Sequence, residues 1–318
     1  MAATIVVALL LPICAGSQGT DNRAAELMAR IDSLRVEGEF AAALQVANEL
    51  LDVRLGDALS KPFEVADAER LVSTLEFILE TSTTTQNEFA KVYRLNLTAK
   101  NHFVKAEFQK AAAAAEEQVR ISRKIFGDDH PDAATSIHNL ATILSAQGDY
   151  AGAEPLYREA LAMRRKTLGN KHPDVAKNLT NLGGVLREQG DYAGAELLVR
   201  EALAIYKEVT GHEDPIVAWC LSQLGFLLYD QGDYAGAERL FEEALAISRN
   251  NLGSDHPDIA DILRVLCSLL YEQGDYAGAE PLCREALAIR RKALGNDHPD
   301  VALSLSSLGD LLYNQGDY

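Results

Sequence analysis

The chain has 318 residues, of which 47% are hydrophobic and 7% aromatic, so it contains enough apolar side chains for a buried core. Its 47 Asp and Glu residues outnumber its 30 Lys and Arg residues, and the net charge is −17. Nucleic acid and anionic membranes require concentrated basic residues, so this balance argues against both as partners.

Residues 1–19 begin with an uncharged apolar stretch, Ala2 to Ala15, which is too short to span a membrane. Its end, at Cys14-Ala15-Gly16, resembles the cleavage site of a signal peptide, although no Lys or Arg precedes the stretch. We favour a signal peptide, and therefore export, over an apolar segment that packs on the first helices of a cytoplasmic protein. Apart from this segment we expect no insertion into a membrane.

Residues 20–131 show helical patterns that are interrupted by turn signals. A turn with glycine at residues 37–40 separates two helices, and a Leu-Gly pair at residues 55–56 ends the second. Residues 66–80 form one amphipathic helix, and a polar loop follows at residues 81–86. We therefore expect residues 20–131 to form divergent helical hairpins.

From residue 132 onward the sequence repeats itself. The motif Gln-Gly-Asp-Tyr begins at Gln147, Gln189, Gln231, Gln273 and Gln315, which are 42 residues apart. A fixed period of this size is typical of stacked repeat proteins, in which one supersecondary unit is copied along an axis. We expect residues 132–318 to form such an array, with its last repeat truncated after its first helix. Residues 90–131 carry a weaker copy in the same register.

Each period contains two helical stripes. Apolar residues recur at spacings of three and four along residues 133–144 and again along residues 153–161, and Gly-Asp at residues 148–149 breaks the helix between them. His-Pro-Asp at residues 172–174 opens the next period, where proline is tolerated at the first helical position. Small residues recur where the two helices would cross, which allows a close approach. Each period is therefore a helical hairpin.

These residues resemble the tetratricopeptide repeat. The family pattern is met by Leu140-Ala141, Leu144, Gly148-Asp149-Tyr150, Ala153, Tyr157 and Ala160. The usual period of the family is about 34 residues. The longer period found here, with His-Pro-Asp at its start, resembles the kinesin-light-chain type of the repeat. The resemblance implies an all-α fold, an α-solenoid in which antiparallel helical hairpins form a right-handed superhelix.

Kinesin light chains also carry a heptad coiled coil ahead of their repeats. Residues 20–60 of this chain show no sustained heptads, so a motor-adaptor role has no support. The resemblance is to the repeat and covers more than half of the chain.

In arrays of this family the first helices line the concave face, and the resemblance places eight residues of this chain in a peptide-binding groove. They are His138, Asn139, Lys177, Asn181, Trp219, Gln223, Phe226 and Arg264. Asn139 and Asn181 match the position where kinesin-light-chain repeats present an asparagine to bound peptide. The resemblance therefore predicts a non-catalytic scaffold whose partner is a protein or peptide.

No motif for catalysis, a cofactor or a metal is evident in the sequence. The histidines never show the i, i+4 spacing of a zinc site, and no glycine-rich phosphate loop occurs. We expect no enzyme activity, no cofactor and no metal. Two other roles stay open: a structural or assembly array, and a regulatory segment of a larger protein that is truncated at Tyr318.

The four cysteines lack the spacing of a metal site. Cys267 takes the position that Ala141 has in its own repeat, and Cys283 takes the position of Tyr157. Both positions lie inside the hairpin, so a bridge between them is compatible with export. We expect buried free thiols instead, because buried cysteine packs as a small hydrophobic residue.

Overall fold

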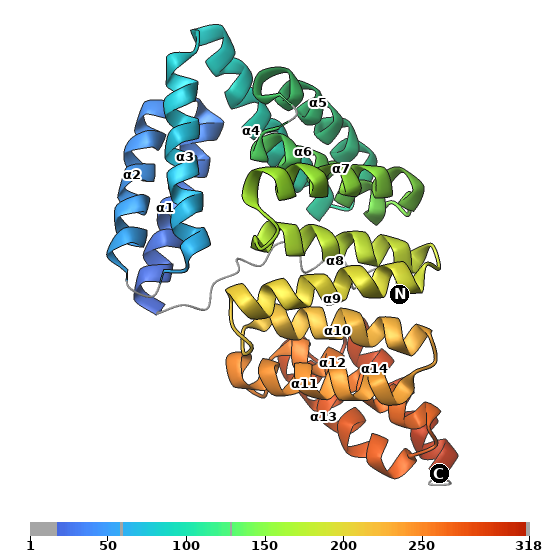
Figure 1. Ribbon diagram of the computed structural model, residues 1–318. Helices are drawn as coiled ribbons and strands as arrows, with labels where there is room; N and C mark the ends of the chain where they lie inside the picture. The colour runs from blue at the N-terminus through green and yellow to red at the C-terminus, as the bar shows by residue number, and fades with distance from the viewer. Residues whose placement is uncertain (1–17, 58–59, 128, 316–318) are drawn as a thin grey trace. The chain divides into compact units, whose positions relative to one another are not determined.

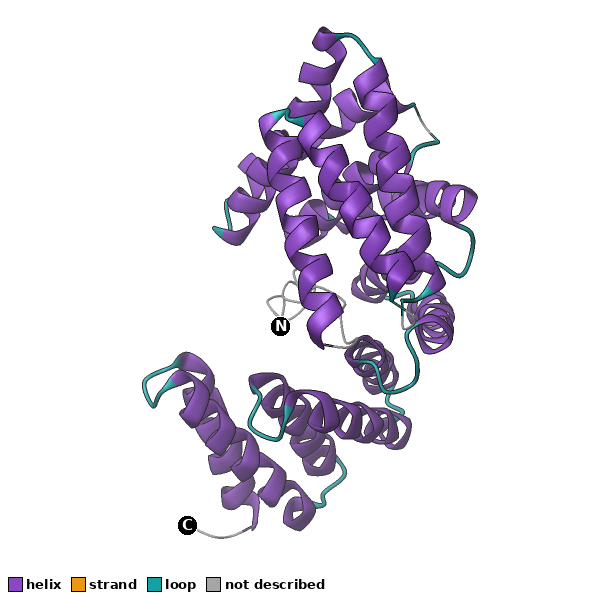
Figure 2. Ribbon diagram, turned by 90° about the vertical axis from the view of Figure 1, so that its left-hand side faces the viewer, coloured by secondary structure: helices purple, strands orange, loops and turns teal. Residues whose placement is uncertain are grey.

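A computed structural model of the chain describes residues 18–57, 60–127 and 129–315 (Figure 1). These residues form helices and connecting loops, and no strand is found among them (Figure 2). The predicted all-α fold of helical hairpins is confirmed. The predicted signal peptide falls mainly on residues 1–17, which lie outside the described residues.

The chain divides into two compact units, Met1–Gln189 and Gly190–Tyr318, called here the N-terminal unit and the C-terminal unit. The N-terminal unit contains α1 (Gln18–Glu37), α2 (Phe40–Gly56), α3 (Pro62–Glu80), α4 (Thr83–Val104), α5 (Phe108–Phe126), α6 (Pro131–Ala146), α7 (Tyr150–Leu168) and α8 (Pro173–Glu188). The C-terminal unit contains α9 (Tyr192–Val209), α10 (Pro215–Asp230), α11 (Tyr234–Leu252), α12 (Pro257–Glu272), α13 (Tyr276–Leu294) and α14 (Pro299–Gln315). We call α6, α8, α10, α12 and α14 the first helices, and α7, α9, α11 and α13 the second helices.

An aspartate cap explains where each second helix begins. Asp149 accepts a hydrogen bond from the backbone N–H of Gly152 at 3.0 Å, and Asp233 accepts one from Gly236 at 2.9 Å. A Cβ built on Gly152 would collide with the Asp149 carboxylate, so the Ala-Gly-Ala that follows the turn needs its glycine. The repeated Gly-Asp-Tyr-Ala-Gly is therefore a local helix-start device.

A second cap sets the start of the first helices. The Nδ1 atoms of His130, His172, His256 and His298 accept hydrogen bonds from the backbone N–H of the aspartate two residues later, at 3.1, 3.1, 3.3 and 3.2 Å. A proline directly follows each histidine and is the first residue of the helix. The backbone N–H that proline lacks would have no partner within the helix at this position, so its absence does not destabilise the helix. At the start of α10, Asp214 occupies the capping position of the histidine and accepts a hydrogen bond from the backbone N–H of Ile216 at 3.0 Å.

Two apolar cores lie among the described residues of the N-terminal unit. Helices α1 to α4 bury Ile31, Phe40 and Phe89 in the first. Helices α4 to α7 bury Ala115 and Ile137 in the second. Helix α4 therefore joins the divergent helices to the regular hairpins.

The prediction of a polar loop at residues 81–86 is wrong for residues 83–86, which belong to helix α4. Helix α4 begins at Thr83, because the Ser82 side chain caps it by accepting from the backbone N–H of Thr85 at 3.3 Å. A serine directly before a run of polar residues is a helix-start signal as well as a loop signal.

Long-range polar contacts tie the divergent helices to the corners before α6 and α8. Arg35 in α1 lies over the Tyr93 ring of α4, 3.7 Å from its centroid, and donates to Asp132 at 3.2 Å. The Tyr93 hydroxyl donates to the same carboxylate at 3.2 Å. In α3, Asp67 faces the Nε2 of His172 at 3.2 Å. These contacts fix the first two His-Pro-Asp corners.

In the C-terminal unit, α10 packs with α11 and α12 packs with α13, while α9 and α14 lie against α10 and α13. Ion pairs join successive second helices. Lys207 pairs with Glu243 at 3.0 Å, and Arg249 pairs with Glu285 at 2.7 Å. Basic side chains of the second helices are thus largely engaged within the array.

Candidate functional site

The predicted groove residues all lie on first helices. In the N-terminal unit, His138 and Asn139 belong to α6, and Lys177 and Asn181 belong to α8. In the C-terminal unit, Trp219, Gln223 and Phe226 belong to α10, and Arg264 belongs to α12. The surroundings of the two sets differ, and each is described within its own unit.

The prediction that His138 contacts a ligand is wrong for this conformation, because the side chain is only 1% exposed. Its Nδ1 lies 2.9 Å from Asn178 Oδ1, and its Nε2 lies 3.3 Å from Asn181 Nδ2. Nδ1 therefore donates to Asn178, and Nε2 accepts from Asn181. Burial and the positive charges of Arg164 and Lys177 lower the pKa of His138 well below its ordinary value of 6.5, so the imidazole is neutral at pH 7. Its role is to orient Asn181.

The two predicted asparagines are partly buried on the faces of α6 and α8. Asn139 Nδ2 donates to Asn96 Oδ1 of α4 at 3.1 Å, so a third asparagine joins them. Asn96 was not among the predicted groove residues, because it lies in the divergent helices. Asn96 lies 43 residues before Asn139, which is close to the repeat period of 42 residues. This spacing was the one feature of the sequence that could have indicated it.

Lys177 stands apart among the lysines of this unit. Its ammonium group makes no hydrogen bond or ion pair with any described residue, although the side chain is partly buried in α8. Burial, with Arg164 and Lys100 nearby, lowers the pKa of Lys177, and Asp174 offsets part of the effect. An ammonium in this state lacks the partner that a buried charge usually has.

In the C-terminal unit, Trp219 and Gln223 are partly exposed on α10, in accordance with a surface position. Phe226 is different, because its ring packs edge-on against Phe241 at 5.0 Å, with an interplanar angle of 77°. It belongs to the margin of the core formed by α10 to α13. The preceding Gly225 permits this packing, since a Cβ there would lie 2.8 Å from the Phe241 ring. The prediction that Phe226 lines a groove is therefore not supported by its packing.

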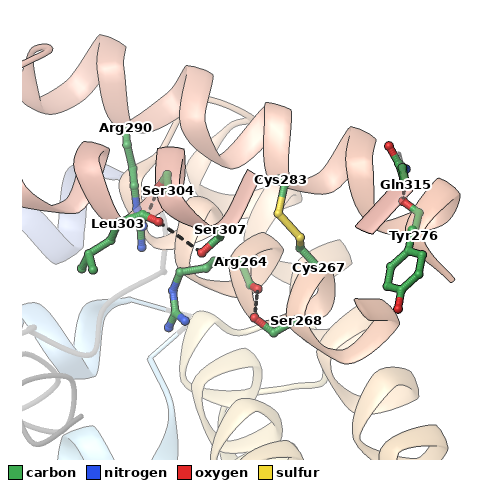
Figure 3. Close-up of a disulfide and its surroundings, with 10 residues drawn as sticks. All are labelled: Arg264, Cys267, Ser268, Tyr276, Cys283, Arg290, Leu303, Ser304, Ser307 and Gln315. Carbon is green, nitrogen blue, oxygen red and sulfur yellow. Dashed lines mark hydrogen bonds between the residues drawn. A yellow bond between two sulfur atoms is a disulfide. The ribbon is translucent and has the colours of Figure 1, made fainter. Parts of the chain in front are cut away.

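Arg264 is a partly buried cation without a partner on α12. Its guanidinium makes no hydrogen bond or ion pair with any described residue, and it points away from the helix pair α12 and α13 (Figure 3). Arg290 of α13 lies close to it and is engaged with the Asp261 carboxylate and with Ser304 Oγ at 2.8 Å. Burial and the like charge of Arg290 lower the pKa of Arg264, and the charges of Asp261 and Asp300 offset part of the effect.

The expectation of free thiols at Cys267 and Cys283 is wrong, because the two residues form a disulfide between α12 and α13 (Figure 3). Their Cα atoms are 5.6 Å apart, a separation typical of bridged cysteines. The repeat position inside the hairpin explains the pairing, since it brings the two residues face to face. Cys220 stays a buried thiol that lies 3.7 Å from the carbonyl oxygen of Val199.

A separate pocket of about 440 Å³ lies in the N-terminal unit between α3 and the corner before α6. Phe77, Phe126 and His130 line it, and the imidazole stacks on the Phe126 ring at 4.3 Å. Arg70 at its edge is ion-paired with Asp67. Because that charge is already neutralised, the pocket suits an uncharged apolar group.

The described residues show no arrangement of three or more His, Cys, Asp or Glu side chains that could bind a metal ion. Among the same residues, no helix has both the length and the apolar character that crossing a membrane requires.

The fold and the first-helix faces define a class of protein, the all-α repeat proteins. A family model described as tetratricopeptide repeat matches residues 95–166, 138–208, 174–250, 216–276 and 258–318. The chain therefore belongs to the tetratricopeptide repeat family. A search of curated proteins gives no match.

Solved structures of similar fold include proteins related to kinesin light chains. BtubC (BKLC) from P. vanneervenii is 25% identical, with a TM-score of 0.56, and the similarity covers 66% of this chain and 85% of that one. A putative kinesin light chain from Podosopora anserina, with nearly identical TPR-like repeats, is 24% identical, with a TM-score of 0.56 and coverages of 64% and 97%. The resemblance to kinesin-light-chain-like repeats is thus confirmed.

A third structure covers more of the chain. A Rap protein complexed with Competence and Sporulation Factor is 15% identical, with a TM-score of 0.57, over 94% of this chain and 88% of that one. At this identity the similarity shows the fold alone.

Proposed function

We propose that the chain is a non-catalytic scaffold that binds an extended segment of another protein along its first helices. The observation that carries this proposal is Arg264, a guanidinium that is partly removed from water and has no acceptor among the described residues. Leaving a charged group in that state is costly unless a binding partner supplies the missing acceptor. A carboxylate of the partner suits a guanidinium best, because it can accept two parallel hydrogen bonds.

Lys177 supports the same role in the N-terminal unit, since this partly buried first-helix cation also makes no hydrogen bond or ion pair with the residues that the structure describes. The side-chain amides of Asn139 and Asn181 lie on the same helix faces. Amides both donate and accept, so they suit the main chain of an extended peptide. His138 takes no direct part and holds Asn181 in place.

A solved complex of a protein with a similar fold provides an analogy for ligand binding. A Rap protein was solved with Competence and Sporulation Factor bound, so a protein of this fold is able to bind a partner. Fold alone does not determine function, and the proposal therefore depends on the residues of this chain. The assembly array and the regulatory segment stay open as alternatives, and no observation favours either over the scaffold.

The test is selection of ligands from a random peptide library displayed on phage, followed by Kd measurements on synthetic copies. We expect the selected peptides to share at least one Asp or Glu. Arg264→Ala should weaken binding by about tenfold or more, as for an anchor in an interface. Arg284→Ala is the matched control, because Arg284 is exposed on α13 and paired with Glu280 at 2.8 Å. Failure to select any peptide, or equal Kd values for both variants, would reject the proposal.

A further inference from the structure

In the α6–α7 and α10–α11 hairpins, a small residue of the first helix faces an aromatic residue of the second at a paired position inside the hairpin. In α6 and α7 the pair is Ala141 and Tyr157, both buried, and the Tyr157 hydroxyl reaches Thr142, beside Ala141, at 2.9 Å. In α10 and α11 the pair is Gly225 and Phe241, in contact. The ring of the second helix therefore fills the space that the small residue leaves.

In the α12–α13 hairpin, a disulfide occupies the paired position instead of a small residue and an aromatic ring. Cys267 and Cys283 stand at the paired position, 16 residues apart, and both are 3% exposed. No aromatic ring fills this crossing. If the bond is broken, two small thiols remain where the α6–α7 and α10–α11 hairpins have a ring, so this crossing becomes unlinked and is filled less than in those two hairpins. The other hairpins carry no comparable dependence on oxidation.

The disulfide also lies next to the proposed ligand contact. Arg264 precedes Cys267 by three residues, about one helical turn, on α12. On the other side of the crossing, Arg290 of α13 donates to Ser304 of α14 (Figure 3). It also donates to the Asp261 carboxylate of α12. A shift of α12 against α13 would therefore move Arg264 and would disturb the contacts that keep Arg290 engaged.

We propose that the Cys267–Cys283 disulfide controls ligand binding at α12, so that the oxidised hairpin presents Arg264 for binding and the reduced hairpin does not. This regulation rests on the proposed function. The chemical step is thiol–disulfide exchange with a dithiol. One thiolate of the dithiol attacks a protein sulfur and the S–S bond breaks. The second thiol then closes the dithiol into its own disulfide, and both protein sulfurs leave as thiols.

The first experiment needs no ligand. Hydrogen exchange of the full chain is measured with and without dithiothreitol, and reduction is verified by counting thiols. We expect the backbone amides of α12 and α13 to exchange about tenfold faster after reduction, because local opening follows local stability. Helices α10 and α11 serve as the internal reference and should not change. An unchanged α12–α13 hairpin, or a disulfide that dithiothreitol does not reduce in the folded chain, overturns the proposal.

A double variant provides the matched control. Cys267→Ala with Cys283→Tyr installs the pair that the α6–α7 hairpin already uses, so the crossing is filled without a bond. We expect this variant to show the slow exchange of the oxidised chain and no response to dithiothreitol. A response to dithiothreitol in this variant would show that the reductant acts elsewhere, and that result also overturns the proposal.

The second experiment measures the Kd of a library-selected acidic peptide for the oxidised chain, the reduced chain and the double variant. We expect reduction to weaken binding by about tenfold or more, with the double variant unaffected by dithiothreitol. If exchange accelerates but Kd stays the same, the disulfide does not control the surface. If no peptide binds in either state, the proposed function fails, while the exchange result still decides whether the hairpin depends on its disulfide.

Discussion

His138 and Arg264 occupy the same repeat position three periods apart, and their surroundings give them opposite roles. The histidine is buried among Asn178, Asn181 and Tyr157, where the neutral imidazole satisfies neighbouring amides. The arginine keeps its charge near the surface and lacks a partner among the described residues. One position of the repeat therefore holds a buried, hydrogen-bonded side chain in one hairpin and a partly buried cation in another.

The buried histidine predicts a pH dependence of stability. Because the pKa of His138 is lowered in the fold, the unfolded chain binds a proton below its ordinary pKa of 6.5 while the folded chain does not. Stability should therefore fall as pH drops below about 6.5, by at most about 1.4 kcal/mol per pH unit for this group. Denaturant melts between pH 7 and 5 should show a shallower slope for His138→Gln than for the native chain. His130 and His172, whose pKa values are also lowered, contribute equally to both proteins.

The control for this prediction is His212→Gln, since His212 lies exposed in the loop before α10. An equal slope for His138→Gln and the native chain would show that His138 is protonated inside the fold.

Close helix crossing predicts intolerance to larger residues. Ala153 of α7 is fully buried, and Ala162 of the same helix is exposed. Ala153→Leu should destabilise by about 1–3 kcal/mol, as overpacking does, and Ala162→Leu should have little effect. Chemical denaturation of the two variants checks the prediction, and equal midpoints would contradict it.

At the scale of the helix, the caps determine both the sequence repeats and the helix boundaries. Four first helices begin at a histidine that accepts from the aspartate two residues later, and each second helix begins at an aspartate. Local hydrogen bonds of this kind depend on residues that are close in sequence. This is why the helix starts followed so closely from the sequence pattern.

The aspartate cap predicts a non-additive pair of substitutions at the start of α7. Asp149→Ala should cost about 0.5–2 kcal/mol through loss of the cap. Gly152→Ala should also destabilise, because its Cβ would collide with the Asp149 carboxylate. In the Asp149→Ala background the collision is gone, so Gly152→Ala should gain up to about 1 kcal/mol from higher helix propensity. A denaturation double-mutant cycle measures the coupling, and strictly additive effects would show that the cap does not restrict residue 152.

For the whole molecule, the net charge of −17 affects how an acidic ligand would associate. The long-range field repels such a ligand, whereas the contact with Arg264 is attractive only at short range. Raising NaCl from about 20 mM to about 200 mM shortens the Debye length to below about 10 Å, so the association rate should rise and the dissociation rate should rise as well. Stopped-flow measurement with a selected peptide tests both. An association rate that falls with salt would show that the local field around Arg264 outweighs the net charge.

The sequence by itself determined the hairpin architecture, the repeat period, the helix starts and the family, because each depends on residues within one period. It also placed Arg264, Lys177, Asn139 and Asn181 on first helices. The tertiary structure decided what lies between periods and between helices. It buried His138, packed Phe226 against Phe241 and joined Cys267 to Cys283.

The tertiary structure also tied α1 and α3 to the first two corners, through Arg35 with Asp132 and His172 with Asp67. These partners are 97 and 105 residues apart in the chain. A helical pattern shows which face of a helix is apolar but not which distant side chain will meet a given polar group. For that reason the helices could be predicted from the sequence, while the partners of the polar side chains had to come from the packed structure.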